Sequence, residues 1–210
     1  MATVDHRRAV ADRNRRGILD ATERLLAKRA PLSMAAIAAE AGVSRPTLYA
    51  HFKTLPDVLE AAVKRSVDDS LEAIEGAEPE VGPADEALER MLEASWRKLA
   101  GYDALARGAA EYLPTESLHR THAPLMAYTA GVIERGQADG TFRRDLPVAW
   151  LVNVYYSLIH AADELARTPG MKRDEALSML KSTIHDLFAA PDPRRTARGS
   201  SRTRSSRTRR

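Results

Sequence analysis

The feature that most constrains this chain is a run of small and apolar residues between Ser33 and Phe52, interrupted by a glycine. A serine before an alanine-rich run, as at Ser33, is typical of a helix N-cap. Gly42 then supplies the backbone freedom needed to end a helix and turn the chain. Ser44 opens a second segment, in which Pro46 fits only the first turn of a helix. The pattern predicts two short helices joined by a tight turn.

The two predicted helices differ in their side chains. The first carries small apolar residues that let another helix pack closely: Ala35, Ile37, Ala38 and Ala41. Val43 is expected to fill the space between the two helices. In the second helix, Leu48 and Phe52 are expected to face inward. Its other residues offer donors, an acceptor, a ring and small contact surfaces: Arg45, Pro46, Thr47, Tyr49, Ala50 and His51. Such a set suits phosphates and base edges in a major groove better than it suits catalysis.

The segment from Ile18 to Val63 resembles the DNA-binding domain of the tetracycline-repressor (TetR) family of transcriptional regulators. The match is closest in SRPTLYAHF, at residues 44–52, and the pattern A-G-V-S-x-x-T-L-Y-x-H-F is specific for a short motif. The resemblance implies an all-α fold. It comprises an N-terminal three-helix DNA-binding domain with a helix-turn-helix and a larger C-terminal helical domain for ligand binding and dimerisation.

The resemblance also implies roles for individual residues. The expected DNA-binding residues are Ser44, Arg45, Pro46, Thr47, Tyr49, Ala50, His51 and Lys53. Of these, the family pattern puts Arg45, Pro46, Thr47 and Ala50 nearest the bases, and Thr47, Tyr49 and His51 on sugar-phosphate oxygens. Leu55 stands where the family often has a lysine, and Ala35 where the repressor that names the family has an arginine. Phosphate binding should therefore depend more on Lys53, on helix N-terminal amides or on the basic segment before the first helix.

The charge distribution supports a division into four segments. Residues 1–53 contain ten Lys and Arg against five Asp and Glu, residues 54–190 contain 14 against 23, and residues 191–210 contain eight against one. We expect a basic N-terminal arm at 1–12, a helix-turn-helix DNA-binding domain at 13–60, a ligand-binding and dimerisation domain at 61–190, and a disordered Arg/Ser-rich tail at 191–210. The alternative for both basic ends is a passive, solubilising role.

Hydrophobic periodicity and proline positions predict the remaining helices. They are expected at about 13–29, 55–74, 84–99, 104–112, 116–137, 146–168 and 174–188, with a turn-rich break at 75–83. Thr54 and Asp57 have the spacing of a capping box for the helix at 55–74. Pro124 is expected to kink or divide the helix at 116–137.

The last two helices predict a homodimer. Apolar residues occupy nearly every side of the chain between Val148 and Ile159, which is more than one core needs. The final helix adds Leu177, Leu180, Ile184, Leu187 and Phe188. Two such helices from each subunit could form a four-helix interface. A two-fold dimer would present two recognition helices about one turn of DNA apart, on a palindromic operator.

Regulation by a small-molecule inducer of unknown identity would require a cavity in the larger domain. The candidate lining residues are Trp96, Tyr102, Tyr112, His119, His122, Met126, Trp150, Asn153, Tyr156 and His160. Each aromatic on this list is more often plain core than pocket lining. His119 and His122 are three apart, but no cysteine or suitably spaced carboxylate supports a metal site, so no metal or cofactor is expected.

Composition excludes several other classes. The chain has no cysteine, which rules out disulfides and thiolate chemistry, and it has no apolar run long enough to span a membrane. The N-terminus is too polar for a secretory signal, so we expect a cytoplasmic protein. No nucleophile signature or glycine-rich phosphate loop indicates an enzyme. The alternatives to an inducible repressor are a constitutive DNA-binding protein and a helical interaction protein that does not bind DNA.

Overall fold

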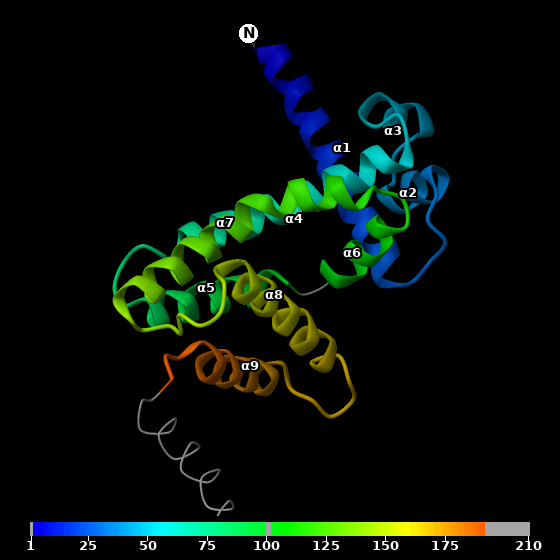
Figure 1. The fold of residues 1–210 in the computed structure, drawn as a ribbon. Helices are drawn as coiled ribbons and strands as arrows, with labels where there is room; N and C mark the ends of the chain where they lie inside the picture. The colour runs from blue at the N-terminus through cyan, green and yellow to red at the C-terminus, as the bar shows by residue number, and fades with distance from the viewer. Residues whose placement is uncertain (1, 100–101, 192–210) are drawn as a thin grey trace, which may run out of the picture. The chain divides into compact units, whose positions relative to one another are not determined.

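The structure is a computed structural model that describes residues 2–99 and 102–191 (Figure 1). Over these residues the chain is helical, without a β-strand, and has one isolated bridge between Phe142 and Ala189. The helices are α1 (Ala2–Ala27), α2 (Met34–Ala41), α3 (Arg45–His51), α4 (Leu55–Glu75), α5 (Ala84–Lys98), α6 (Tyr102–Ala110), α7 (Thr115–Asp139), α8 (Val148–Leu165) and α9 (Arg173–Phe188). The expected all-α fold is confirmed. Apart from residue 191, the predicted disordered tail lies outside the described residues.

The helices group into two compact units that do not follow chain order. Unit 1 consists of Met1–Ala77 and Glu93–Ala127, and unit 2 of Glu78–Leu92 and Tyr128–Arg210. Unit 1 therefore contains α1 to α4, the second part of α5, α6 and the first part of α7. The sequence-based division had assigned residues 61–190 to the larger domain, whereas the structure groups α6 with the helix-turn-helix.

The first helix differs most from the sequence-based prediction. It was expected to begin near Arg13, but α1 begins at Ala2 and therefore includes the segment predicted as a basic arm. Its second half supplies the core of unit 1, with Ile18 and Leu25 buried. The buried Thr22 hydroxyl donates to the Ile18 carbonyl at 2.9 Å, so this polar group is satisfied inside the helix.

Helix α6 approaches α1 through a glycine. A Cβ added to the buried Gly108 would lie 2.3 Å from Cδ2 of Leu26, too close for two carbon atoms. The absence of a side chain at Gly108 lets Leu26 pack directly against the α6 backbone. Leu26 of α1 and Gly108 of α6 therefore form a close contact between the two helices.

In unit 2, α8 and α9 form a helical hairpin that is stabilised by ion pairs of the buried Asp163 carboxylate. Asp163 is fully buried in α8 and pairs with Arg167 one turn later. Arg173, at the start of α9, donates to the second Asp163 oxygen at 2.8 Å. The two arginines compensate the buried charge, and Arg173 ties the start of α9 to the end of α8.

Helix α7 passes through Pro124 without a break in its assigned helix. Of the two expected effects of this proline, a kink or a division of the helix, the division is therefore wrong; proline still removes one backbone donor there. Across the two described stretches, no helix is both long and apolar enough to cross a membrane.

Candidate nucleic-acid interface

Helix α2 is defined at both ends by the residues that the sequence singled out. The Ser33 hydroxyl accepts the Ala36 amide at 3.1 Å, which makes Ser33 the N-cap. Gly42 follows the helix in the left-handed region, at φ +66°, and the Val43 amide donates to the Ala38 carbonyl at 3.0 Å. This pattern is the glycine-dependent helix ending that leads into the turn before α3.

Helix α3 is anchored from one side only. Leu48 is completely buried and Phe52, which follows the helix, is 4% exposed, as the four-residue spacing predicted. Ser44 caps the helix by accepting the Thr47 amide at 3.2 Å, and the Ser44 and Thr47 hydroxyls are 2.7 Å apart. Pro46 lies in the first turn, where its missing amide hydrogen leaves no helix bond unmade.

The predicted DNA-contacting residues cover the rest of α3. Tyr49 exposes 48% of its surface, a large fraction for an aromatic residue. The exposed members of the predicted set are Ser44, Arg45, Pro46, Tyr49, Ala50 and Lys53. Thr47 and His51 are half-buried. The Ser44 and Thr47 hydroxyls already form hydrogen bonds within the helix cap. Each can therefore bind a ligand only through the donor or acceptor sites that these bonds leave unused.

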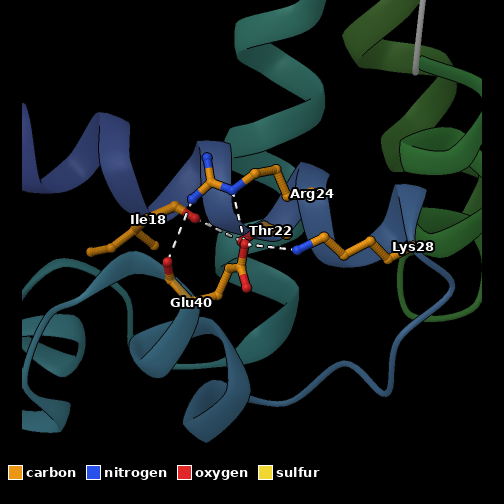
Figure 2. Close-up of polar contacts among 5 residues, drawn as sticks. All are labelled: Ile18, Thr22, Arg24, Lys28 and Glu40. Carbon is orange, nitrogen blue, oxygen red and sulfur yellow. Dashed lines mark hydrogen bonds and ion pairs between the residues drawn. The ribbon is translucent and has the colours of Figure 1, made fainter.

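A charged cluster holds α2 against α1 (Figure 2). Glu40 of α2 accepts from Arg24 Nε on α1 at 2.9 Å and from Lys28 Nζ, in the turn directly after α1, at 3.3 Å. These hydrogen bonds lower the pKa of Glu40 below its ordinary value, and the bond from Arg24 has the larger effect. Glu40 is thus an ionised acceptor that fixes the first helix of the motif to α1.

A second charged cluster joins α1 to α4. Thr54 and Asp57 form the predicted capping box at the start of α4, with the Asp57 carboxylate accepting the Thr54 amide at 2.9 Å. About two turns after Asp57, Arg65 forms ion pairs with Asp20 at 2.7 Å and with Glu23 at 2.6 Å, both on α1. Sequence reasoning missed this network because the partners are 42 and 45 residues apart.

An arginine of α1 stacks on the residue that ends α3. The Arg15 guanidinium carbon lies 4.7 Å from the centre of the Phe52 ring. This is a cation–π geometry, and the side chain stays exposed. No periodicity in the sequence indicated this pairing, because the two residues belong to separate helices.

Six of the predicted ligand-pocket residues fall in unit 1. Trp96 is buried in α5, and Tyr102 of α6 makes a short hydrogen bond to His122 Nε2 of α7. Burial raises the pKa of Tyr102 above its ordinary value. His119 and Tyr112 are exposed, and Met126 is half-buried. The structure therefore brings together Tyr102 and His122, whereas His119 lies on the surface.

The other four predicted pocket residues belong to α8 in unit 2. Trp150 exposes 57% of its surface and Asn153 is also exposed. The Tyr156 hydroxyl is 3.0 Å from that of Thr129 on α7, and burial raises the pKa of Tyr156 to about 12. His160 is half-buried. Trp150 is thus a surface residue of α8, and the Tyr156 hydroxyl has a polar partner on another helix.

Each unit contains hollows of its own. Unit 2 has a small cavity of about 120 Å³, lined mainly by apolar and charged residues of α5 and α9, among them Glu89 and Lys181. None of the ten predicted pocket residues lines it. In unit 1, an open groove of about 690 Å³ between α1, α4 and α6 includes Tyr102. A second groove, of about 480 Å³, includes Tyr112. No group of three or more potential metal ligands occurs in the parts of the chain with defined placement.

The comparisons with known proteins agree with the helix-turn-helix geometry. Residues 18–62 match the family described as "Bacterial regulatory proteins, tetR family". The HTH-type transcriptional repressor LfrR of Mycolicibacterium smegmatis is 30% identical over 178 residues, which span 82% of this chain and 89% of LfrR. The expectation that the chain is not an enzyme is confirmed by such homologues, which are transcriptional regulators.

Solved structures extend the similarity to the whole fold. The crystal structure of LfrR from Mycobacterium smegmatis in complex with proflavine has a TM-score of 0.65 and 28% identity, and the match covers 82% of this chain and 94% of that one. A TetR-family structure from Rhodococcus sp. has a TM-score of 0.71 and 26% identity, with 83% and 98% covered. The chain belongs to the TetR family of transcriptional regulators.

Proposed function

We propose that this regulator is a ligand-responsive repressor that binds a palindromic DNA operator as a homodimer and is released by a small-molecule inducer. The observation that carries the proposal is the one-sided anchoring of α3. Leu48 and Phe52 are buried, whereas Arg45, Tyr49 and Ala50 are exposed, and a major groove is wide enough to admit an α-helix. The relative LfrR is a transcriptional repressor, which supports repression as the outcome.

The residues proposed to contact DNA divide into two kinds. Arg45 and Ala50 are proposed to lie at base edges and Tyr49 at a sugar-phosphate oxygen, as the family resemblance implies. Lys53 follows α3, and its side chain is proposed to bind a phosphate without regard to sequence. Ser44 and Thr47 combine capping with phosphate contact, since backbone amides near a helix N-terminus also attract anions.

The homodimer is proposed to form mainly through α8. Trp150 and Leu165 are exposed, and Val154 and Leu158 are half-exposed on the same helix. These four residues recur at intervals of four, four and seven, and so lie on one helical face. In α9, by contrast, Leu180, Ile184 and Phe188 are buried within a single chain, and Met179 is the large apolar residue that stays exposed. The proposed interface therefore uses less of α9 than the sequence suggested.

The inducer is proposed to be an aromatic molecule of the size of proflavine. LfrR has been crystallised with proflavine, which motivates this compound as the first ligand to test here. The expected mechanism is a shift of population towards a conformation in which the two recognition helices no longer match the operator. Thermodynamic linkage then requires ligand and operator to weaken each other's binding by the same factor.

Selection of duplexes from a random-sequence pool by the full chain would test the proposal. We expect an enriched palindrome with half-sites about one helical turn apart, and proflavine should weaken binding of that duplex. The absence of any enriched sequence would contradict the DNA-binding part. Proflavine binding that leaves operator affinity unchanged would contradict its role as inducer and favour a constitutive DNA-binding protein.

Two substitutions would separate base contacts from phosphate contacts on the selected duplex. Arg45→Ala should reduce discrimination between the selected and a scrambled duplex by about 1 to 3 kcal/mol. Lys53→Ala should weaken binding to both duplexes similarly and reduce the salt slope by about 1. Fluorescence anisotropy at several salt concentrations measures both effects. Equal loss on both duplexes for Arg45→Ala would remove this residue from sequence reading.

A further inference from the structure

The N-terminal half of α1 extends beyond the part of the chain that matches the family. The match begins at residue 18, whereas α1 begins at Ala2. Residues 2–17 add about 24 Å of helix at 1.5 Å per residue. In Figure 1 this dark-blue part of α1 extends past α2 and α3, which belong to the same unit. It is therefore a projecting element of unit 1, formed by the segment that the sequence predicted as a basic arm.

The projecting half is strongly basic. It carries an N-terminal arginine patch, defined as Arg7, Arg8, Arg13, Arg15 and Arg16, and all five side chains are exposed. Asp12 is the one acidic residue between His6 and Arg16. The acidic residues of the other half of α1, Asp20 and Glu23, are paired with Arg65. Among the described residues, no acidic side chain forms an ion pair with any arginine of the patch. The patch thus carries a net positive charge.

Arg15 connects the patch to the recognition helix. Its guanidinium stacks on Phe52, directly after α3 and directly before Lys53. Arg8 is seven residues away, nearly two helical turns, so it lies on the same side of α1 about 10 Å further along. The basic surface therefore continues from the end of α3 outward along α1.

We propose that the N-terminal arginine patch of α1 binds the phosphates of the DNA that flanks the site read by α3. This proposal rests on the proposed function, since it requires α3 to lie on DNA. An α-helix is about 10–12 Å wide with its side chains, whereas the minor groove is about 6 Å wide. The patch therefore binds the backbone and does not enter that groove. Such contacts lengthen the bound site and carry no sequence preference.

The test compares two double variants that remove the same charge. Arg7→Gln with Arg8→Gln changes the patch, and Lys64→Gln with Arg120→Gln is the control, because these exposed cations lie on α4 and α7. Glutamine is close to arginine in helix propensity, and circular dichroism checks that α1 remains folded. Both variants and the unaltered full chain are titrated against a duplex selected from a random-sequence pool, either trimmed to the enriched site or extended by about 10 base pairs on each side.

The proposal predicts an effect confined to the patch variant on the extended duplex. There the slope of log affinity against log salt should become shallower by about 1 to 2 for each bound protomer. Each phosphate contact contributes about 0.9 to the magnitude of this slope, and the variant removes up to two contacts. The control should keep the slope of the unaltered chain. Equal slopes for the patch variant and the control would overturn the proposal while leaving DNA binding by α3 intact. An equal loss on trimmed and extended duplexes would also overturn it, because the contacts would then lie inside the site. If the unaltered chain selects no duplex, the proposed function itself fails.

Discussion

Helices α3 and α8 differ in how far their apolar side chains are exposed to solvent. In α3, the apolar anchor Leu48 is completely buried, and the exposed residues are mostly polar or small. In α8, Leu151 and Tyr155 are buried, but Trp150 exposes 57% of its surface and Leu165 40%. A short helix with one buried stripe is complete within its chain, whereas a helix with apolar residues on a second face lacks a partner for that face.

The comparison separates two uses of exposed surface. The exposed face of α3 carries polar groups that stay hydrated until a polar ligand replaces the water. Such a face suits binding to a DNA duplex. The exposed face of α8 presents groups that gain free energy from leaving water, which suits another protein surface. Identical substitutions in the two helices should therefore have unequal effects, and those effects can be measured.

The largest expected effect is on the buried anchor of α3. Leu48→Ala should lower the free energy of unfolding of unit 1 by about 2 to 5 kcal/mol, because it removes buried methyl groups and leaves a cavity. The matched control is Leu165→Ala in α8, which makes the same change at a site that is exposed in the single protomer. Both changes are made in a Trp150→Glu background, where the proposed dimer is weakened, and Leu165→Ala should then cost less than about 0.5 kcal/mol. Chemical denaturation followed by circular dichroism compares the two. Equal costs would mean that the α8 leucine is as well packed as the α3 leucine.

The next effect concerns association. Trp150→Glu should leave the folded protomer intact and weaken the proposed dimer by about 2 to 4 kcal/mol, since buried aromatic residues dominate such interfaces. Val81→Glu is the control, because Val81 is 58% exposed, as exposed as Trp150, but lies in the segment before α5. Sedimentation equilibrium measures dissociation of each variant. A Trp150→Glu protein that dimerises like the control would show that α8 is not the interface.

Much of the fold could be predicted because its signals are local. The caps at Ser33, Ser44 and Thr54 and the glycine turn at Gly42 each depend on residues within one or two turns. The start of α1 could not be placed in the same way, because charged residues without an apolar stripe look like a frayed end. The close approach of α6 to α1 requires Gly108 beside Leu26, and a single glycine in the sequence does not indicate its distant partner.

The candidate site divides in the same way. The exposed set of α3 followed from spacing, because Leu48 and Phe52 fix which side of the helix is buried. The candidate ligand residues were chosen by type alone, and residue type does not distinguish an exposed Trp150 from a buried Trp96. The contacts of Arg15 and Arg65 were not predicted. An arginine side chain is long enough to reach several helices, and the sequence does not indicate which residue it contacts.

Two adjacent tyrosines of α8 give a finer comparison within one helix. The Tyr155 hydroxyl is buried, and no described residue forms a hydrogen bond with it, whereas the Tyr156 hydroxyl pairs with Thr129. Tyr155→Phe should therefore raise the free energy of unfolding by about 1 kcal/mol, because it removes an unsatisfied polar group. Tyr156→Phe should lower it by a similar amount. Thermal melts of the two variants check this difference in sign, and a loss of stability in Tyr155→Phe would indicate a partner for its hydroxyl.

The smallest expected effect is a pH dependence that belongs to the α1–α2 contact. The hydrogen bonds of Arg24 and Lys28 hold the pKa of Glu40 below its ordinary value of 4.5. A carboxyl whose pKa is lowered by folding stabilises the fold above its unfolded pKa, and that stabilisation is lost as pH falls through the folded pKa. Glu40→Gln should therefore make the loss of stability below about pH 4.5 less steep, with little change in slope near neutral pH. Glu72→Gln removes an exposed glutamate of α4 and should leave the acid dependence unchanged. If both variants follow the same curve in acid, the Glu40 cluster contributes nothing to holding α2 on α1, and the burial of Ile37 and Ala38 alone positions the motif.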